Sequence, residues 1–464
     1  MDSLSFESGK PLHPLRAAAP SATLAAPAGL LSSATLAASA TLAPSAPPAR
    51  ALTAPTSARA SPRPSPLARC ARFLASPPLW LTLLACAALL AARRPDALFN
   101  PQFWAEDGTH FFHPAWDQGW SVLFAQYAGY LHTVPRLVAA FAVQFDPRWS
   151  PAIFVGASFA LTLYVAARTQ SSRFPFPPHA AYAFAVVLVP DQFEVLLFLV
   201  NVQWILAGGL LLLLVSADAR RWWQHTHDAL AAILLGLTGP FSVLFAPLFL
   251  WRVWHRRTRA SFVVTSLVLI FAGVQAWTLW KNPVVMTADR IATEALLAVP
   301  GMRIAGSLLA GSLVPLDYPL LIETALGALT LLAAVALALR RGPARPERIW
   351  LALAFGALLA ASLLRCRYVL IPLCHATFGS RYFFLPQLVL LWLLAPLLRD
   401  ARPWLARSAA VLLLWILAVN VPRLRESGLP DLHWREHAAQ LRAGTAVTVP
   451  INPGWSFTVP ARPR

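Results

Sequence analysis

Long apolar stretches separated by short arginine clusters run through this chain from about residue 79 to residue 420. A helix that crosses a bilayer needs about 20 mostly apolar residues, so each stretch predicts one span or a pair of shorter helices. Of the 464 residues, 57% are hydrophobic and only 12% are charged, about half the charged share of soluble domains. The pattern predicts an all-α polytopic membrane protein and excludes an ordinary soluble enzyme or a disulfide-built secreted domain.

The net charge of +18 comes almost entirely from arginine, because Lys10 and Lys281 are the only lysines. In a soluble protein such a charge would indicate nucleic-acid binding. Here the arginines cluster between apolar stretches, which is typical of cytoplasmic loops in membrane proteins. We therefore expect a membrane lipid environment and no nucleic-acid partner.

Three regions differ in composition. Residues 1–75 are rich in Ala, Pro and Ser and carry scattered arginines, and repeated prolines break any helix there. We expect a disordered basic cytoplasmic tail; the alternative is a targeting peptide. Residues 76–420 form the predicted transmembrane domain, and residues 421–464 a short external tail with an amphipathic helix at 431–442 and a β-like stretch after it. External loops are predicted at 93–148, 281–317 and 365–381.

The hydropathy and positive-inside rules together predict about 11 transmembrane helices, with the amino terminus in the cytoplasm and the carboxyl terminus outside. We expect the bacterial inner (plasma) membrane. The stretch 179–216 is too long for one span and contains Pro190, so it predicts two helices joined by a turn. The stretch 229–251 has arginine clusters on both sides and Gly239-Pro240 in its middle. It predicts a hairpin of two short helices, which is tolerated at membrane depth only where the backbone is buried in protein or lines a cavity.

The first external loop combines adjacent carboxylates with many aromatic residues. Glu106 and Asp107 lie among phenylalanines and tryptophans, and the loop continues to His132 and Arg136. A carboxylate in a partly dry setting can take a proton from a hydroxyl group. Glu106 and Asp107 are therefore candidate catalytic residues, with His132 and Arg136 as candidate substrate-binding residues. The alternative is that Glu-Asp-Gly forms an ordinary solvated turn.

A second polar cluster contains Asp191, Glu194 and Asn201. It could bind sugar hydroxyls, or it could simply cap two helices that meet there. If the two acidic loops meet, their carboxylates could also hold a divalent metal, which needs several oxygen ligands around one ion.

The loop 365–381 carries a positive charge that is unusual for an external loop, from Arg365, Arg367, His375 and Arg381. Guanidinium groups stabilise a phosphate leaving group as it gains charge. The alternative is that these arginines only contact lipid headgroups. Cys366 and Cys374 share the loop and could pair in an oxidising exterior or remain thiols.

The acidic pair Glu106-Asp107, directly after the first span, resembles the GT-C superfamily of polytopic glycosyltransferases. Arg381-Tyr382, before a late apolar span, resembles the basic positions with which those enzymes hold lipid phosphate. The resemblance implies a cell-envelope enzyme that moves a hexosyl or pentosyl group from a polyprenyl-phosphate donor to an acceptor hydroxyl on the extracytoplasmic face. It implies no certain cofactor, and no motif identifies the sugar or the acceptor, which could be a glycan, a lipid or a protein.

Two other classes of protein remain open. Broken helices also suit a multi-pass transporter or lipid flippase, which needs a polar site near the middle of the membrane. A non-catalytic assembly protein would leave the acidic and arginine loops far apart. The transferase hypothesis predicts that Glu106, Asp107, Asp191 and Arg381 converge around one external cavity.

Overall fold

The structure is a computed structural model that describes residues 77–190, 192–283, 293–311, 319–367, 370 and 379–461. The chain divides into two compact units, Met1–Arg63 and Pro64–Arg464. Every described residue belongs to the second unit. The predicted tail 1–75 lies outside the described residues, as do Asp191 and most of the loop between Arg367 and Gly379.

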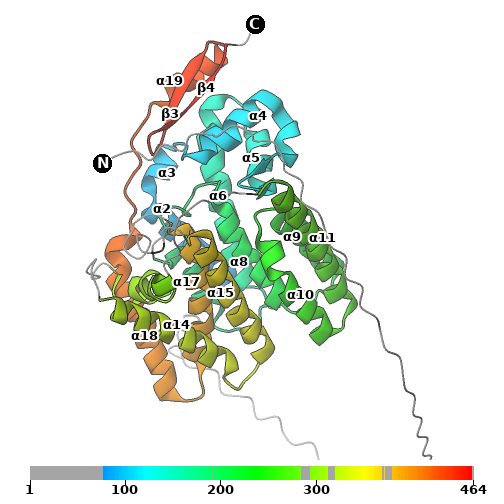
Figure 1. Cartoon of the computed structure of the whole chain (residues 1–464), viewed down its shortest axis with the longest axis vertical. Helices are drawn as coiled ribbons and strands as arrows, with labels where there is room; N and C mark the ends of the chain where they lie inside the picture. The colour runs from blue at the N-terminus through cyan, green and yellow to red at the C-terminus, as the bar shows by residue number, and fades with distance from the viewer. Residues whose placement is uncertain are drawn as a thin grey trace, which may run out of the picture. The chain divides into compact units, whose positions relative to one another are not determined.

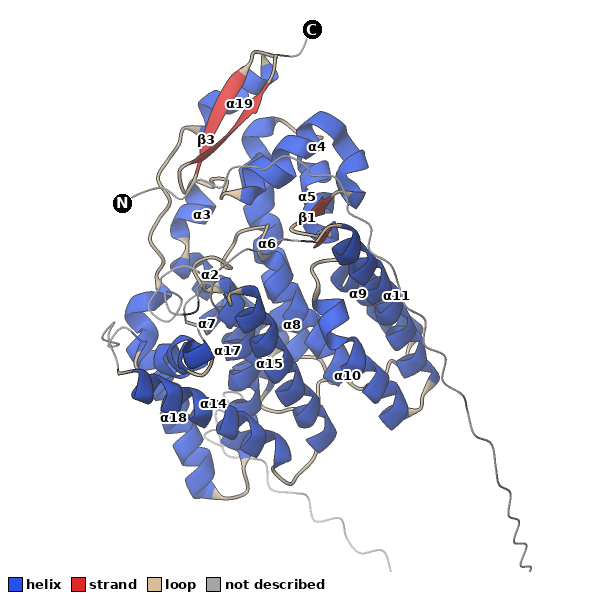
Figure 2. Ribbon diagram, viewed as in Figure 1, coloured by secondary structure: helices blue, strands red, loops and turns tan. Residues whose placement is uncertain are grey.

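Helices make up most of the described structure, as Figures 1 and 2 show. Within the described residues, six helices are long and apolar enough to cross a membrane. They are α6 (Ser150–Thr169, with the turn before it), α11 (Arg259–Lys281), α14 (Leu320–Leu339), α15 (Arg345–Arg365), α17 (Arg381–Leu394, with η7, Ala395–Arg399) and α18 (Pro403–Leu424). The shorter apolar helices are α2 (Leu79–Arg93), α5 (Thr133–Ala142), α7 (His179–Leu188) and α8 (Val202–Val215). The protein is therefore mostly helical and membrane-embedded, while the predicted count of about 11 spans is not confirmed.

Most of the remaining elements are short, except the helices α9 and α10. The segment between α2 and α5 contains α3 (Pro95–Phe99), η1 (Asp107–Phe112), α4 (His113–Gln118), η2 (Gly119–Phe124), β1 (Gln126–Tyr127) and β2 (Tyr130–Leu131), and η3 (Pro147–Trp149) precedes α6. Later in the chain come α9 (Trp222–Gly236), α10 (Phe241–Arg256), η4 (Thr293–Ala295), α12 (Ala298–Pro300), η5 (Gly301–Gly306) and α13 (Ser307–Leu309). We call residues 100–132 the Glu106 loop.

The break predicted at Gly239-Pro240 is confirmed, because α9 ends before it and α10 begins after it. Gly239 has φ +85°, a left-handed conformation that favours glycine. The backbone groups freed by the break pair with the Glu106 loop: the Gly239 N–H donates to Leu131 O (3.0 Å), and the Thr133 N–H donates to Leu237 O (3.2 Å). The break therefore joins the hairpin α9–α10 to the Glu106 loop.

Helix α8 lies at the centre of the described helices (Figure 1) and packs against α6, α9, α10, α15 and α17. All of its residues except Trp204 are buried, so no side of it faces a surrounding medium. The stretch 179–216 forms the two predicted helices, α7 and α8, and the turn between them carries Glu194 and Asn201.

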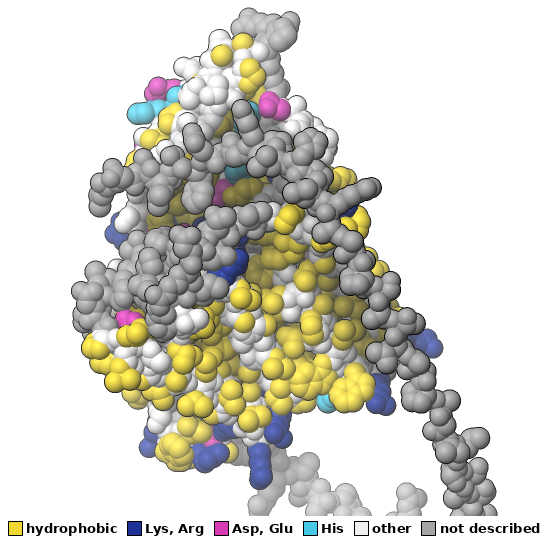
Figure 3. Space-filling model, viewed as in Figure 1, with side chains coloured by type: hydrophobic (Ala, Val, Ile, Leu, Met, Phe, Trp, Pro, Cys, Tyr) yellow, Lys and Arg dark blue, Asp and Glu magenta, His cyan; other side chains and the backbone are white. Residues whose placement is uncertain are grey.

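Hydrophobic side chains also cover outer surfaces of the long helices, such as Phe262, Ile270 and Trp277 on α11. Figure 3 shows them gathered in a band over α10, α11 and α15, with Lys and Arg side chains along one edge of the band. A soluble protein rarely exposes an apolar area of this extent, whereas lipid covers it at no cost. The surface therefore agrees with a membrane environment.

The carboxyl-terminal segment folds as its sequence predicts, with an amphipathic helix and then a hairpin. Helix α19 (Trp434–Arg442) precedes β3 (Val447–Ile451) and β4 (Trp455–Val459), which pair antiparallel with Val449 opposite Phe457. Buried and exposed side chains alternate along β3, as a strand with one covered face requires. The covered face packs on the Glu106 loop.

Candidate functional site

A cavity of about 530 Å³ lies between the Glu106 loop, the start of α8 and the helices α10, α11, α15 and α17. Polar and aromatic side chains line one part of it: Glu106, Tyr127, Tyr130, Asn201, Gln203, Trp204, Ser362, Arg365, Arg381 and Tyr382. Apolar side chains line the rest, among them Val243, Leu244, Leu279 and Leu358. Four of the residues predicted from the sequence therefore meet here, Glu106, Asn201, Arg365 and Arg381.

Glu106 is held by a tyrosine of its own loop. The Tyr127 hydroxyl donates a hydrogen bond to Glu106 Oε1 at 3.0 Å. Burial, with Glu106 nearby, raises the pKa of Tyr127 above its usual range, so this hydroxyl remains a donor. The imidazole of His110 stacks on the Tyr127 ring at 4.4 Å between centroids, and burial lowers the pKa of His110. The carboxylate of Glu106 is thus fixed at the wall of the cavity.

Asp107 has a different environment from its neighbour. Its side chain is buried and does not line the cavity. Asp107 Oδ1 accepts the backbone N–H of Val200 at 2.7 Å, and burial raises the pKa of Asp107 well above its usual range. The carboxylate therefore holds the turn before α8 against the Glu106 loop. Of the two predicted catalytic carboxylates, the structure brings only Glu106 to the cavity.

Arg381 lies at the amino-terminal end of α17, where Glu194 holds it. Glu194 accepts the Arg381 backbone N–H at 3.1 Å, its Nη1 at 3.3 Å and the Ser380 hydroxyl at 3.4 Å. The Arg381 side chain keeps 31% of its surface exposed, against 11% for Glu194. Glu194 therefore orients the guanidinium from behind and leaves part of it open to the cavity.

Opposite charges share this cavity. The charges of Glu106 and Arg381 interact electrostatically, and Arg365 lies close enough to act on the buried Tyr130. Asn201 Nδ2 donates to the Glu194 carbonyl oxygen at 2.6 Å, which joins the turn before α8 to the arginine side. A carboxylate thus faces two guanidinium groups in a space with apolar walls.

Four of the described substrate-binding candidates do not line this cavity: Glu194, which holds Arg381 from behind, and His132, Arg136 and Arg367. His132 is buried between aromatic rings, with Tyr130 at 4.6 Å, and burial together with Arg136 lowers the pKa of His132 to about 3. The Arg136 guanidinium donates to the carbonyls of His110 and Ala125, and burial lowers its pKa to about 10. Arg136 holds the Glu106 loop together, because the irregular backbone of the loop leaves carbonyl groups that need donors, and His132 packs among the aromatic rings of the loop. Arg367 Nη1 donates instead to Leu364 O at 2.9 Å.

Other predictions fall partly outside the described residues. Asp191, His375 and Cys374 lie there. Cys366 is a buried free thiol in the structure, which agrees with the alternative of an unpaired cysteine. Within the described residues, no group of three or more His, Cys, Asp and Glu side chains is placed to hold a metal ion. The divalent metal stays a prediction, because Asp191 was one of its expected ligands.

Tyr127 and Tyr130 are site residues that sequence reasoning did not single out. They flank a two-residue turn in which Ala128 and Gly129 both have positive φ, the pattern of a tight hairpin between β1 and β2. Gln203 Nε2 donates to the Tyr130 hydroxyl at 3.4 Å. The signal in the sequence is weak, because only the glycine at 129 indicates the turn that directs both rings to the cavity.

The geometry defines a class of protein: a membrane-embedded helical protein with a cavity in which a carboxylate faces two arginines. No protein-family model, no curated protein and no solved structure matches this chain. The resemblance carried by Glu106-Asp107 and Arg381-Tyr382 therefore stays a proposal.

Proposed function

We propose that this protein is an integral membrane glycosyltransferase that moves a sugar from a polyprenyl-phosphate donor to an acceptor hydroxyl on the extracytoplasmic face. The observation that carries the proposal is the shared cavity of Glu106, Arg365 and Arg381. Of the four residues that the transferase hypothesis predicts to converge, Glu106 and Arg381 line this cavity, Asp107 does not, and Asp191 lies outside the described residues. The proposal therefore rests on Glu106 together with the two arginines.

The chemistry needs a base on one side of the reacting centre and a phosphate anchor on the other. Glu106 takes the proton of the acceptor hydroxyl as its oxygen attacks the anomeric carbon. The bond from that carbon to the phosphate oxygen breaks, and its electron pair leaves with the polyprenyl phosphate. Arg381 and Arg365 stabilise the charge that develops on the phosphate.

The apolar lining supports a lipid-linked donor. Val243 and Leu244 of α10 and Leu358 of α15 lie in the same cavity as the charged groups. A free nucleotide sugar would leave these walls uncovered, whereas the first isoprene units next to the phosphate would pack on them.

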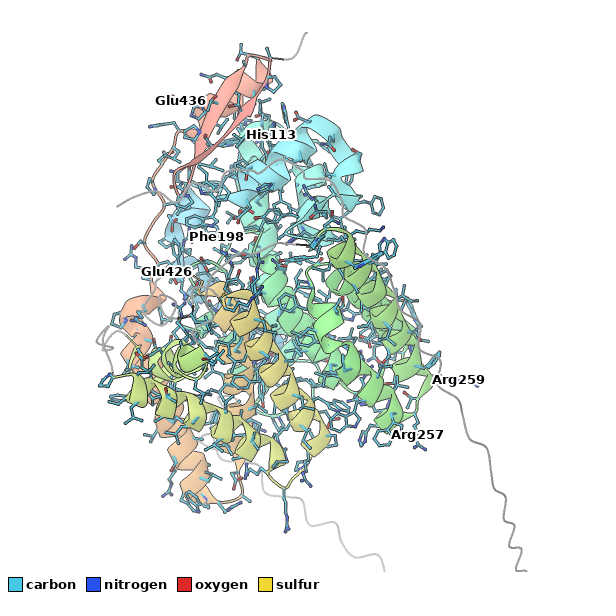
Figure 4. All side chains as sticks on the ribbon, in the orientation of Figure 1. His113, Phe198, Arg257, Arg259, Glu426 and Glu436 are labelled. Atoms are coloured by element: carbon cyan, nitrogen blue, oxygen red, sulfur yellow. The ribbon has the colours of Figure 1, made fainter. Side chains whose placement is uncertain are left out.

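The distribution of arginines supports an extracytoplasmic site. Figure 4 shows Arg257 and Arg259 at the turn between α10 and α11, at the ends of these helices away from the Glu106 loop. Clusters of this kind mark cytoplasmic ends by the positive-inside rule. The cavity then opens on the opposite side of a bacterial plasma membrane, with the amino terminus inside and the carboxyl terminus outside.

The test is transfer of labelled sugar by the purified full-length protein from a panel of polyprenyl-phosphate sugars to envelope acceptor fractions. We expect Glu106→Gln to lower transfer about 100-fold or more while donor binding persists, since a general base contributes about 10²–10⁴. We expect Arg381→Gln to weaken donor binding. Asp117→Asn is the matched control, because Asp117 belongs to the same segment but pairs with His113 at 3.1 Å away from the cavity. Wild-type rates in Glu106→Gln contradict the proposal.

A transporter or lipid flippase is the second candidate, and one observation favours it. The broken hairpin reaches the cavity through Pro240 and Phe241, as discontinuous helices do at transport sites. Proteoliposomes loaded with a fluorescent polyprenyl-phosphate sugar distinguish the two: a transporter moves the intact lipid between leaflets, and a transferase cleaves it.

A further inference from the structure

The carboxyl-terminal segment lies directly against the turn that carries Glu106. We call residues 431–459, with α19, β3 and β4, the C-terminal clamp. The Ala105 N–H donates to Asn452 O at 2.5 Å, and Trp104 forms a parallel β-bridge with Asn452. The backbone immediately before Glu106 is therefore hydrogen-bonded to a residue more than 300 positions later in the chain.

The clamp also contacts the backbone just after the acidic pair. A Cβ atom added to Gly108 would lie 2.9 Å from Ile451 Cδ1 and 3.0 Å from Phe457 Cε1. The Phe457 ring stacks on His113 at 5.4 Å, and Figure 4 shows His113 beside the hairpin. A methyl group at position 108 therefore needs the Ile451 side chain or the Phe457 ring of the clamp to shift.

The turn between these two contacts is strained. Ala105 has φ +37°, in the left-handed region that costs a residue with a Cβ atom about 1–2 kcal/mol. Such a conformation persists only where its surroundings impose it. Asn452 holds the turn from the clamp side, and Val200 holds it from the other side through Asp107.

The clamp is itself anchored at several points. Trp434 Nε1 donates to Pro147 O at 3.1 Å, and its ring lies 4.7 Å from that of Phe103. Arg442 pairs with Asp146 at 2.7 Å. Phe103 lies near the start of the Glu106 loop, and Asp146 and Pro147 follow α5, so the clamp has a defined place from which to hold the turn.

We propose that the C-terminal clamp positions Glu106 for proton transfer, so that residues 451–457 act on catalysis without lining the cavity. The inference rests on the proposed function, because it takes Glu106 as the base. A displacement of about 1 Å at a reacting group costs up to about 100-fold in rate. Loosening the clamp therefore lowers kcat and leaves the donor site on α15 and α17 intact.

Gly108→Ala in the full-length protein tests the contact, with sugar transfer and donor KM measured beside thermal unfolding. We expect kcat to fall about 10- to 100-fold, donor KM to stay the same and the fold to persist. Ile451→Val removes the Cδ1 atom, the nearer of the two contacts, so the double variant recovers part of kcat, while Phe457 Cε1 stays 3.0 Å from the new methyl group. Thr458→Ala is the matched control, because Thr458 lies on the outward face of β4 and its hydroxyl hydrogen-bonds to that of Thr448 across the hairpin at 2.9 Å.

The outcomes separate this inference from the proposed function. An active Glu106→Gln variant overturns the function itself. If Glu106→Gln is inactive while Gly108→Ala keeps its kcat, or if Ile451→Val fails to rescue the loss, the clamp does not position Glu106. Should Gly108→Ala not fold, Ile451→Ala reports the same contact from the clamp side, and an unchanged kcat there overturns the inference.

Discussion

Replacing Asp107 separates its structural role from the catalytic role of its neighbour. Asp107→Asn keeps an oxygen that can accept the Val200 N–H, so we expect it to retain most of the transfer activity that Glu106→Gln loses. Asp107→Ala removes the acceptor and leaves the buried Val200 N–H without its 2.7 Å partner. We therefore expect the alanine variant to be active only as far as it remains folded.

The size of the effect follows from the burial of this hydrogen bond. A typical intramolecular hydrogen bond contributes about 0.5–1.5 kcal/mol, and an orphaned buried donor costs about 1–3 kcal/mol. Asp107 is only 3% exposed, so solvent cannot replace the lost acceptor. We expect Asp107→Ala to lower the free energy of unfolding by about 2 kcal/mol and Asp107→Asn by much less.

The pH dependence of protein stability gives a second measure of the role of Asp107. Folding raises the pKa of Asp107, so its stabilising contribution is complete below the unfolded pKa of about 3.9 and is lost as the pH rises through the folded value. Asp107→Asn has no such group, and its stability relative to the wild type should increase as the pH rises. The assay is the thermal unfolding midpoint in detergent from pH 4 upward, with transfer activity beside it. A well-folded Asp107→Asn variant as inactive as Glu106→Gln would refute this reasoning.

Three further changes test other parts of the structure. Tyr127→Phe removes the hydroxyl that holds Glu106 and should lower kcat about tenfold, since about 1.4 kcal/mol corresponds to that factor; an unchanged kcat means that the hydrogen bond does not matter. Gly239→Ala should lower the unfolding midpoint, because φ is +85° and the new Cβ would lie 2.6 Å from Gln203 Oε1. Gly273→Ala is the control and should not lower it, because open space surrounds Gly273. Equal effects of the two variants contradict the backbone geometry described at Gly239. Burial lowers the pKa of His132 to about 3, so its contribution to stability is complete above the unfolded pKa of about 6.5 and is lost as the pH falls toward 3. His132→Phe should therefore make the unfolding midpoint less dependent on pH over this range. An unchanged pH profile in this variant contradicts the role of His132.

Local signals in the sequence were sufficient for several elements. Arginine clusters on both sides of 229–251 and the pair Gly239-Pro240 predict the hairpin of α9 and α10, because charge and backbone restriction act over a few residues. The β-like stretch after residue 442 likewise corresponds to the strands β3 and β4. Helix α19 begins at Trp434, a little after the predicted 431, because Asp431 accepts the His433 N–H in the turn before it.

The roles of individual side chains in the site could not be predicted in this way. Whether Glu106 or Asp107 faces the cavity depends on the backbone of Ala105 and on contacts with Val200 and Asn452, all set by packing between distant segments. His132 and Arg136 have the residue types of a binding site, yet tertiary contacts bury both inside the loop. The sequence indicates which chemistry is present, and the packing decides which group reaches the cavity.

Helix α8 has 14 residues, a length of about 21 Å, against about 30 Å for the hydrocarbon core of a bilayer. Mismatch with lipid arises only where a helix touches lipid, and neighbouring helices enclose this one. The length of α8 therefore does not have to match the bilayer thickness. It can match the depth of the cavity, which begins at the first residues of α8. During biogenesis, neighbouring helices cover α8 only after they have assembled around it. We therefore expect α8 to be the last part of the bundle to reach its final environment.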